Sequence, residues 1–187
     1  MDDSVPFASR EYLILLAILV FSRGADFLST WVATPHLVLE GNPIAKWLGW
    51  KWGVALNVVL IPLLACWPGI AIAFSTTSAL VAARNFQSAW LMRSMGEAAY
   101  GDWHIRRICE TPLSLFLGCL AGNVILVALP GVALILFGGD LLLPTAVGFG
   151  LLVYSVAVAV FTLLSLWRIR RRHRAQISSG MESSALN

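Results

Sequence analysis

The sequence predicts an all-α fold, a polytopic transmembrane helix bundle, and composition and spacing both support this. Of its 187 residues, 58% are hydrophobic and only 12% are charged, whereas a soluble domain carries about 25% charged residues. The mean hydropathy is +0.79. Apolar runs near the length of about 20 residues that a helix needs to cross a bilayer recur along the chain. We expect one domain over residues 1–170 with five spans, at about 11–32, 52–67, 70–92, 112–137 and 142–167.

The first span contains charged residues. Its apolar run, residues 12–21, is too short alone, so the helix must continue through Arg23 and Asp26 to about residue 32. The connection that follows predicts a short interfacial helix over about 43–50. Asn42 suits the N-cap position and Pro43 the first helical position. The tryptophans beside it suit the membrane interface.

The remaining spans are separated by turn or charged segments. Trp67-Pro68-Gly69 predicts a turn before the third span, and residues 93–110 read as a charged loop. Pro112 suits the first turn of the fourth helix, with a kink expected at Pro130-Gly131. Residues 138–140 form a turn before the fifth span. We expect residues 171–187 to be a basic and then polar cytoplasmic tail without fixed structure.

Basic residues predict the orientation. The run 168–174 follows the last span, which is typical of a cytoplasmic anchor rather than a nucleic-acid site. Counting back, the connections with Arg93, Arg106, Arg107, Lys46 and Lys51 lie inside, and the outer turns carry no basic residue. We therefore expect the N-terminus outside and the chain in the plasma membrane (the cell inner membrane). Four spans with one re-entrant segment is the alternative.

Ionisable groups at membrane depth mark either a functional site or a structural ion pair. Arg23, Asp26 and Thr30 share one helix face. At about 1.5 Å per residue, Asp26 and Arg84 both lie roughly 21 Å into their spans. We predict that Asp26 pairs with Arg84, with Arg23, or with both. Two arginines against one carboxylate favour an anionic ligand.

Polar residues in the neighbouring segments extend this cluster. The sequence predicts a polar pocket on the cytoplasmic side, or a purely structural lock between helices. Its members are Arg23, Asp26, Thr30, His36, Glu40, Asn42, Arg84 and Asn85.

Other chemistry receives little support from the residues. Asp26, His36, Glu40, Glu97 and His104 offer metal-ligand atoms but lack a spacing such as H-E-x-x-H, so no metal is expected. No G-x-S-x-G elbow is present, and no cofactor is expected. The cysteines show no metal-ligand spacing.

Two stripes of small and polar residues predict close helix contacts in lipid. One runs along the third span: Ser75, Ser78, Ala82 and Asn85. The other, on the fourth span, consists of Ser114, Gly118 and Gly122. Packing within the chain and contact with a second copy both remain open.

The run Asp26-Phe-Leu-Ser29-Thr30, followed by Glu40-Gly-Asn42-Pro43 and by Lys51, resembles a family. This is a group of small prokaryotic membrane proteins of uncharacterised function with the signature D-x-x-S-T … E-x-N-P. The resemblance covers about residues 20–90. It implies that Asp26, Thr30, Glu40, Asn42 and Pro43 are the marked positions, and it implies no activity.

Three functions follow as expectations. The first is binding or transport of a small anionic or lipid-headgroup ligand. The second is an intramembrane enzyme acting on a lipid or lipid-linked substrate, with Asp26, Glu40 or His36 as acid and base groups. The third is a structural accessory subunit of a larger membrane complex. Expected partners are membrane lipids and, through the small-residue faces, a second copy or a larger complex.

Overall fold

The computed structural model describes the backbone of residues 4–185 and the side chains of residues 4–171. It is all-α, as predicted, and no strand occurs in the described backbone. The helices are α1 (Arg10–Ala33), α2 (Pro43–Leu64), α3 (Pro68–Met95), α4 (Glu97–Glu110), α5 (Leu113–Phe137) and α6 (Leu142–Ala185).

Four of these helices are long and apolar enough to cross a membrane. They are α1, α2, α5 and the Leu142–Arg171 part of α6. Helix α3 is 28 residues long but contains many serine, threonine and amide side chains, and it is not among the four. Length and composition therefore mark four of the five expected spans.

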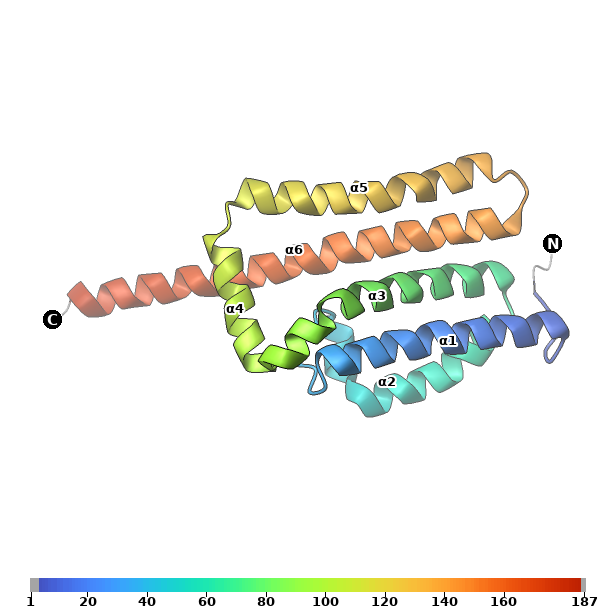
Figure 1. Cartoon of the computed structure of the whole chain (residues 1–187), viewed down its shortest axis with the longest axis horizontal. Coiled ribbons are helices and arrows are strands. Elements are labelled where there is room, and N and C mark those ends of the chain that lie inside the picture. Colours follow the sequence, from blue (N-terminus) through green and yellow to red (C-terminus); the bar gives the residue numbers. More distant parts are fainter. Residues whose placement is uncertain (1–3, 186–187) are drawn as a thin grey trace.

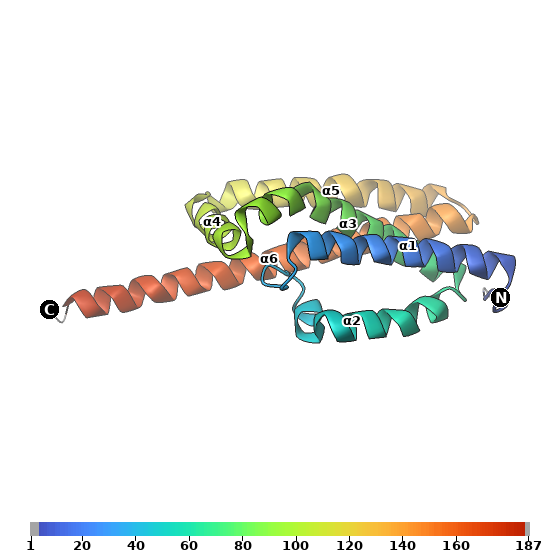
Figure 2. The ribbon, with the colours of Figure 1, turned by 60° about the horizontal axis from the view of Figure 1, so that its bottom comes forward.

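The long helices form a row, shown in Figure 1 and, turned, in Figure 2. Helix α3 lies in the middle, with α1 on one side and α6 on the other, and α5 packs on the far side of α6. Helix α2 lies beside α1 at the other edge of the row. Helices α1, α3 and α6 run in one direction, and α2 and α5 run in the opposite one.

The contact between α1 and α3 follows a repeat of seven residues. The α1 side consists of Leu15, Leu19, Ser22, Asp26, Ser29 and Ala33, and the α3 side of Ala71, Ser75, Ser78, Ala82, Asn85 and Ala89. Alternating steps of three and four residues keep two parallel helices in register. Most of the α3 residues are small, which lets the backbones approach closely. The predicted α3 stripe therefore packs within the chain.

Glycines set the distance between α6 and its two neighbours. A Cβ added at Gly148 would lie 2.6 Å from the Gly131 carbonyl oxygen of α5. A Cβ at Gly150 would lie 2.7 Å from the Ala73 oxygen of α3, and the Thr77 hydroxyl donates to the Gly150 carbonyl at 3.0 Å. Since the obstacles are backbone atoms, only glycine fits at these positions.

The second span differs from the predicted one at both ends. The interfacial helix begins at Pro43 with Asn42 as its cap, as predicted. However, it runs into the span with a single break at Gly49, whose φ is 65°. The span ends at Leu64 rather than residue 67, because Ala65 to Trp67 form the turn that leads into α3.

The prediction of a loop over residues 93–110 is wrong. After a turn at Gly96, whose φ is 80°, residues Glu97–Glu110 form α4. Glu97 in the first turn and Arg107 in the last complement the helix dipole.

Helix α6 extends further than the span predicted for it. It continues past residue 167 to Ala185, into the segment 171–187 that the sequence predicts to be a tail. Residues such as arginine, glutamine and methionine in this stretch are good helix formers. Residues 186–187 of that tail lie outside the described residues.

Candidate functional site

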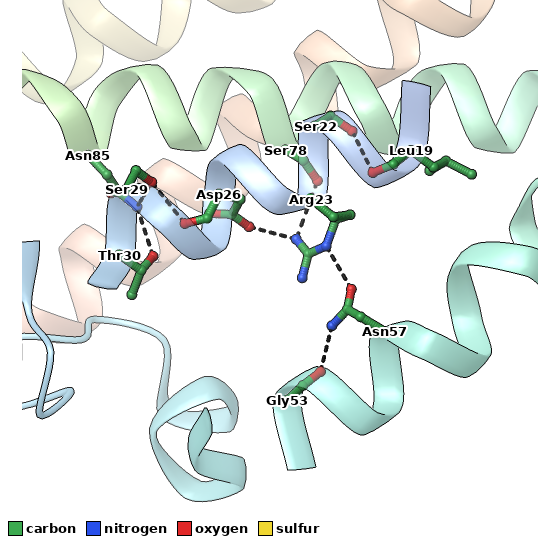
Figure 3. Close-up of polar contacts among 10 residues, drawn as sticks. All are labelled: Leu19, Ser22, Arg23, Asp26, Ser29, Thr30, Gly53, Asn57, Ser78 and Asn85. Carbon is green, nitrogen blue, oxygen red and sulfur yellow. Dashed lines mark hydrogen bonds and ion pairs between the residues drawn. The ribbon is translucent and has the colours of Figure 1, made fainter. Parts of the chain in front are cut away.

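Arg23 is the centre of a polar contact that joins three helices (Figure 3). Its Nε donates to Asn57 Oδ1 of α2 at 2.8 Å. Its Nη1 donates to Asp26 Oδ2 of α1 at 2.6 Å and to Ser78 Oγ of α3 at 3.3 Å. We call Arg23, Asp26, Asn57 and Ser78 the Arg23 cluster. The predicted pairing of Asp26 with Arg23 is confirmed.

The cluster is largely shielded from solvent. The side chains of Arg23 and Asp26 are only 20% and 17% exposed. The guanidinium carbon also lies 5.4 Å from the ring centre of Phe27 and 5.3 Å from that of Phe74. An arginine that is removed from water gains from such contacts as well as from its ion pair.

A second polar contact lies one helix turn further along α1. Asn85 Nδ2 of α3 donates to Ser29 Oγ at 3.3 Å and to Thr30 Oγ1 at 3.2 Å. The Ser29 hydroxyl in turn donates to the Asp26 carbonyl at 2.8 Å. Because Ser29 is fully buried, these bonds fix the register of α1 against α3.

The loop after α1 forms the rim of this region. Glu40 Oε1 accepts the Asn42 backbone N–H at 2.7 Å, and Asn42 Oδ1 accepts the Ile44 N–H at 3.0 Å as the cap of α2. The predicted neighbours Glu40 and Asn42 therefore lie together in the loop between α1 and α2.

Helices α2 and α4 hold that loop in place. Trp50 Nε1 donates to the Pro35 carbonyl at 2.8 Å, and the Trp50 ring lies 6.0 Å from that of Phe27. The His36 backbone N–H donates to Glu97 Oε1 of α4 at 2.9 Å. The side chain of His36 is exposed, so this residue contributes its backbone rather than its imidazole.

Two ionisable side chains of α4 stack on each other nearby. The rings of Tyr100 and His104 are nearly parallel, with centres 5.8 Å apart. Removal from water raises the pKa of Tyr100 and lowers the pKa of His104. Both shifts favour the neutral form.

The predicted pairing of Asp26 with Arg84 is wrong. Arg84 is exposed and forms no salt bridge with any described side chain. Successive helical residues are about 100° apart, and it is Asn85 that faces α1. Arg84 and Asp26 have similar depths along their helices, but Arg84 is not on the face of α3 that contacts α1. The cluster therefore contains one cation and one anion, without the positive excess expected from two arginines.

The five residues considered as metal ligands do not gather. Within residues 4–171, no group of three His, Cys, Asp or Glu side chains is close enough to hold a metal ion. Asp26 and Glu40 lie on the α1 side, whereas Glu97 and His104 belong to α4.

A surface hollow on α6 is separate from the cluster. It is a hollow of about 410 Å³ on α6, lined by Leu152, Val153, Val156, Ala157, Val160 and Phe161. Its lining carries no polar side chain, so it suits lipid chains or another apolar helix.

Asn57 is not among the residues predicted for the site, although the sequence contains a signal that points to it. It is a single amide within the apolar run of α2, and polar residues within spans usually face the bundle interior. Its own Nδ2 donates to the Gly53 carbonyl at 2.8 Å, which turns Oδ1 toward Arg23.

Helix α2 packs loosely on the remainder of the bundle. None of its residues, all of which are described, is buried. Besides the Arg23–Asn57 bond, its polar contacts with the preceding segments are those of Lys46 with the Val38 carbonyl, of Trp50 with the Pro35 carbonyl and of the Tyr12 hydroxyl with the Pro62 carbonyl. Ile61 and Leu64 pack against the apolar residues of α1. Helix α2 is thus the least buried wall of the cluster.

Comparison of the chain with protein-family models, with curated protein sequences and with solved structures returns no match.

Proposed function

We propose that the chain is a multi-pass protein of the plasma membrane (the cell inner membrane) with five spans, α3 included. Support comes from the packing of α3, which lies between two apolar helices and parallel to both. If α1 crosses the bilayer, α3 must share its depth. Ser78, Thr77 and Asn85 of α3 then face α1 or α6, where they find hydrogen-bond partners.

The distribution of charge supports the proposed orientation, with the N-terminus outside and the C-terminus in the cytoplasm. Arg93, Arg106, Arg107 and Arg171 lie at the end of the bundle that α4 crosses. The described residues near the other end carry Arg10, Glu11 and Asp140. An excess of arginine is typical of the cytoplasmic side.

Within this frame, we propose that the Arg23 cluster binds the anionic group of a small molecule or a lipid headgroup. The observation that carries the proposal is a shielded guanidinium with an unused donor. Within the described part of the chain, Arg23 Nη2 donates no hydrogen bond, whereas Nε and Nη1 donate three. A phosphate or carboxylate is the partner that such a donor prefers.

Two further features support binding at this site. The loosely packed α2 is the wall that would move to admit a ligand, since only Asn57 joins it to Arg23. The positions marked by the resemblance, Asp26, Thr30, Glu40 and Asn42, border the same region.

The test uses inorganic phosphate as the probe and thermal unfolding in detergent as the readout. We expect phosphate to stabilise the wild type and the Arg84→Gln variant alike, and to have a much smaller effect on Arg23→Gln. Arg84 is the matched control because it is an exposed arginine on α3. Arg23→Lys keeps the charge and should retain part of the effect. Equal stabilisation of wild type and Arg23→Gln would overturn the proposal.

A structural role is the second candidate, and a specific observation favours it. Arg23 and Asp26 neutralise each other at 2.6 Å and already bind partners on α2 and α3. Such a lock needs no ligand. An accessory subunit would then contact a second copy or a larger membrane complex through the outer face of α5. On that face, a Cβ at Gly118 or Gly122 would meet nothing within 4 Å among the described residues.

The enzyme alternative has weaker support. Of its candidate acid and base groups, Asp26 is paired with Arg23 and Glu40 accepts the Asn42 N–H. The His36 imidazole is exposed and its backbone is bound to Glu97. We therefore rank catalysis behind binding and behind a structural role.

A further inference from the structure

Helix α4, the last turn of α3 and residues 168–171 of α6 carry a group of exposed arginines. They are Arg93, Arg106, Arg107, Arg168 and Arg171, which we call the basic end. The carboxylates of α4 are fewer, and two of the three are engaged. Glu110 pairs with Arg107 at 3.0 Å, and Glu97 accepts the His36 N–H. The basic end therefore carries an excess of positive charge.

Helix α4 lies across the end of the row rather than along it (Figure 1). It is attached to α6 through Arg170, whose Nη2 donates to the carbonyls of Ile108 at 3.4 Å and Thr111 at 3.0 Å. These carbonyls belong to the C-terminal turn of α4, where a cation is favourable. The attachment holds α4 against α6, across the end of the row of helices.

Two of the arginines lie over indole rings. The guanidinium of Arg93 is 5.7 Å from the Trp31 ring centre, and that of Arg171 is 5.3 Å from the Trp167 ring centre. Tryptophans gather at the boundary between headgroups and acyl chains. Both arginines are therefore at the level of lipid phosphates if the long helices cross the bilayer.

One exposed apolar side chain on α4 suits the same position. Ile105 is 44% exposed, although it is next to the exposed Arg106. A helix with basic and apolar residues on its surface binds a membrane by inserting the apolar residues and placing its cations among anionic headgroups.

From these observations we infer that the basic end is a docking surface for anionic phospholipid headgroups of the cytoplasmic leaflet, with α4 as its in-plane helix. The inference depends on the proposed membrane placement but not on ligand binding by the Arg23 cluster. The chemistry is that of a phosphate bound by several guanidinium groups. A membrane is favoured over a nucleic acid because the arginines border apolar spans and pair with interfacial indoles.

The experiment compares lipid binding to the full chain by native mass spectrometry in detergent. The probes are phosphatidylglycerol and phosphatidylcholine with identical acyl chains. The variants are Arg106→Gln/Arg107→Gln, Arg106→Lys/Arg107→Lys and, as control, Arg10→Gln. Arg10 is an exposed arginine at the opposite end of the bundle.

We expect the wild type, the lysine variant and Arg10→Gln to prefer phosphatidylglycerol. The glutamine double variant should lose about fivefold in that preference per arginine, because each basic residue near a membrane surface contributes about 1 kcal/mol. The preference should also fall at high salt. An unchanged preference in the glutamine double variant would overturn the inference, and so would an equal loss in Arg10→Gln.

Arg23→Gln separates the two proposals. If this variant alone loses the preference, the lipid binds at the Arg23 cluster and the basic end is not the docking surface. If the variant keeps the preference but no longer responds to phosphate, both proposals stand. Should it respond to phosphate as the wild type does, the proposal for the Arg23 cluster fails while that for the basic end survives.

Discussion

Arg23 donates hydrogen bonds to side chains of α1, α2 and α3, and two phenylalanine rings flank it. A guanidinium placed within apolar spans is stable only because these partners replace water. Its pair with Asp26 is therefore a condition for the packing of the three helices, whether or not a ligand also binds there.

The ion pair predicts strong coupling between two substitutions. We expect Arg23→Gln and Asp26→Asn each to lower the free energy of unfolding by about 3–5 kcal/mol, since each leaves a shielded charge without its partner. The double variant should lose much less than the sum. Thermal and denaturant unfolding in detergent measure all three values. Additive losses would show that the two side chains do not interact.

Asn85 provides a second prediction at this scale. Asn85→Leu removes the bonds to Ser29 and Thr30 and should destabilise the protein by about 1 kcal/mol, as polar contacts between membrane helices typically contribute. Gln87→Leu is the matched control, because Gln87 is an exposed amide on the same helix. Equal effects of the two substitutions in unfolding experiments would contradict the α1–α3 register.

Single residues were predicted from the sequence with mixed success. The Arg23–Asp26 pair can be predicted from the sequence, because residues three apart in a helix lie on the same face. The pairing of Asp26 with Arg84 is wrong because similar depth does not place two residues on the faces by which their helices touch. Asn57 was overlooked because a contact between two helices depends on their rotation, which the sequence of one helix does not reveal.

Among the helices, α6 depends on glycines for its contacts with α5 and α3. We expect Gly148→Ala to cost about 1–3 kcal/mol, because the new Cβ would meet the Gly131 carbonyl and force the helices apart. Gly122→Ala in α5 has free space around it and should be neutral or slightly stabilising, since alanine favours helix. Unfolding temperatures of the two variants test the pair. A larger loss for Gly122→Ala would indicate that the outer face of α5 is packed after all.

The attachment of α4 predicts a local effect. Arg170→Gln removes the donor to the Ile108 and Thr111 carbonyls, so α4 should open more often. Hydrogen exchange of the α4 amides should then accelerate, while that of α1 should not. Uniform acceleration across both helices would mean that Arg170 stabilises the whole fold rather than this attachment.

Elements were predicted better than their boundaries. Apolar length identified α1, α2, α5 and α6, and Pro43, Pro68 and Pro112 lie at or next to the starts of their helices. Helix α4 was missed because its stability comes from contacts with α3, α6 and the loop before α2, which only the folded chain provides.

For the whole molecule, the row of helices predicts termini on opposite sides of the membrane. If the chain has five spans, a reporter fused at the C-terminus should lie in the cytoplasm and one fused at the N-terminus should lie outside. If both fusions read on the same side, the number of spans is even and α3 does not cross. Reporter activity in intact cells gives this result directly.

The order of helices in the row was beyond the sequence. Which helices are neighbours depends on the matching of small residues between α1 and α3 and of glycines between α5 and α6. The α3 set is visible in the sequence as a stripe, but its partner on α1 is not. The stripe predicted on α5, Ser114, Gly118 and Gly122, does not include Gly131, the glycine that meets α6.

Solid-state NMR of the protein in lipid bilayers tests the central claim, an arginine that joins α1, α2 and α3 at membrane depth. Arginine is labelled with ¹⁵N at the guanidinium and aspartate with ¹³C at the carboxyl carbon, and the dipolar coupling between them is measured. We predict a strong Arg–Asp coupling from the Arg23–Asp26 pair, whose N–O distance is 2.6 Å, and its loss in Asp26→Asn. A spectrum without that coupling, or with the same coupling in Asp26→Asn, would contradict the account.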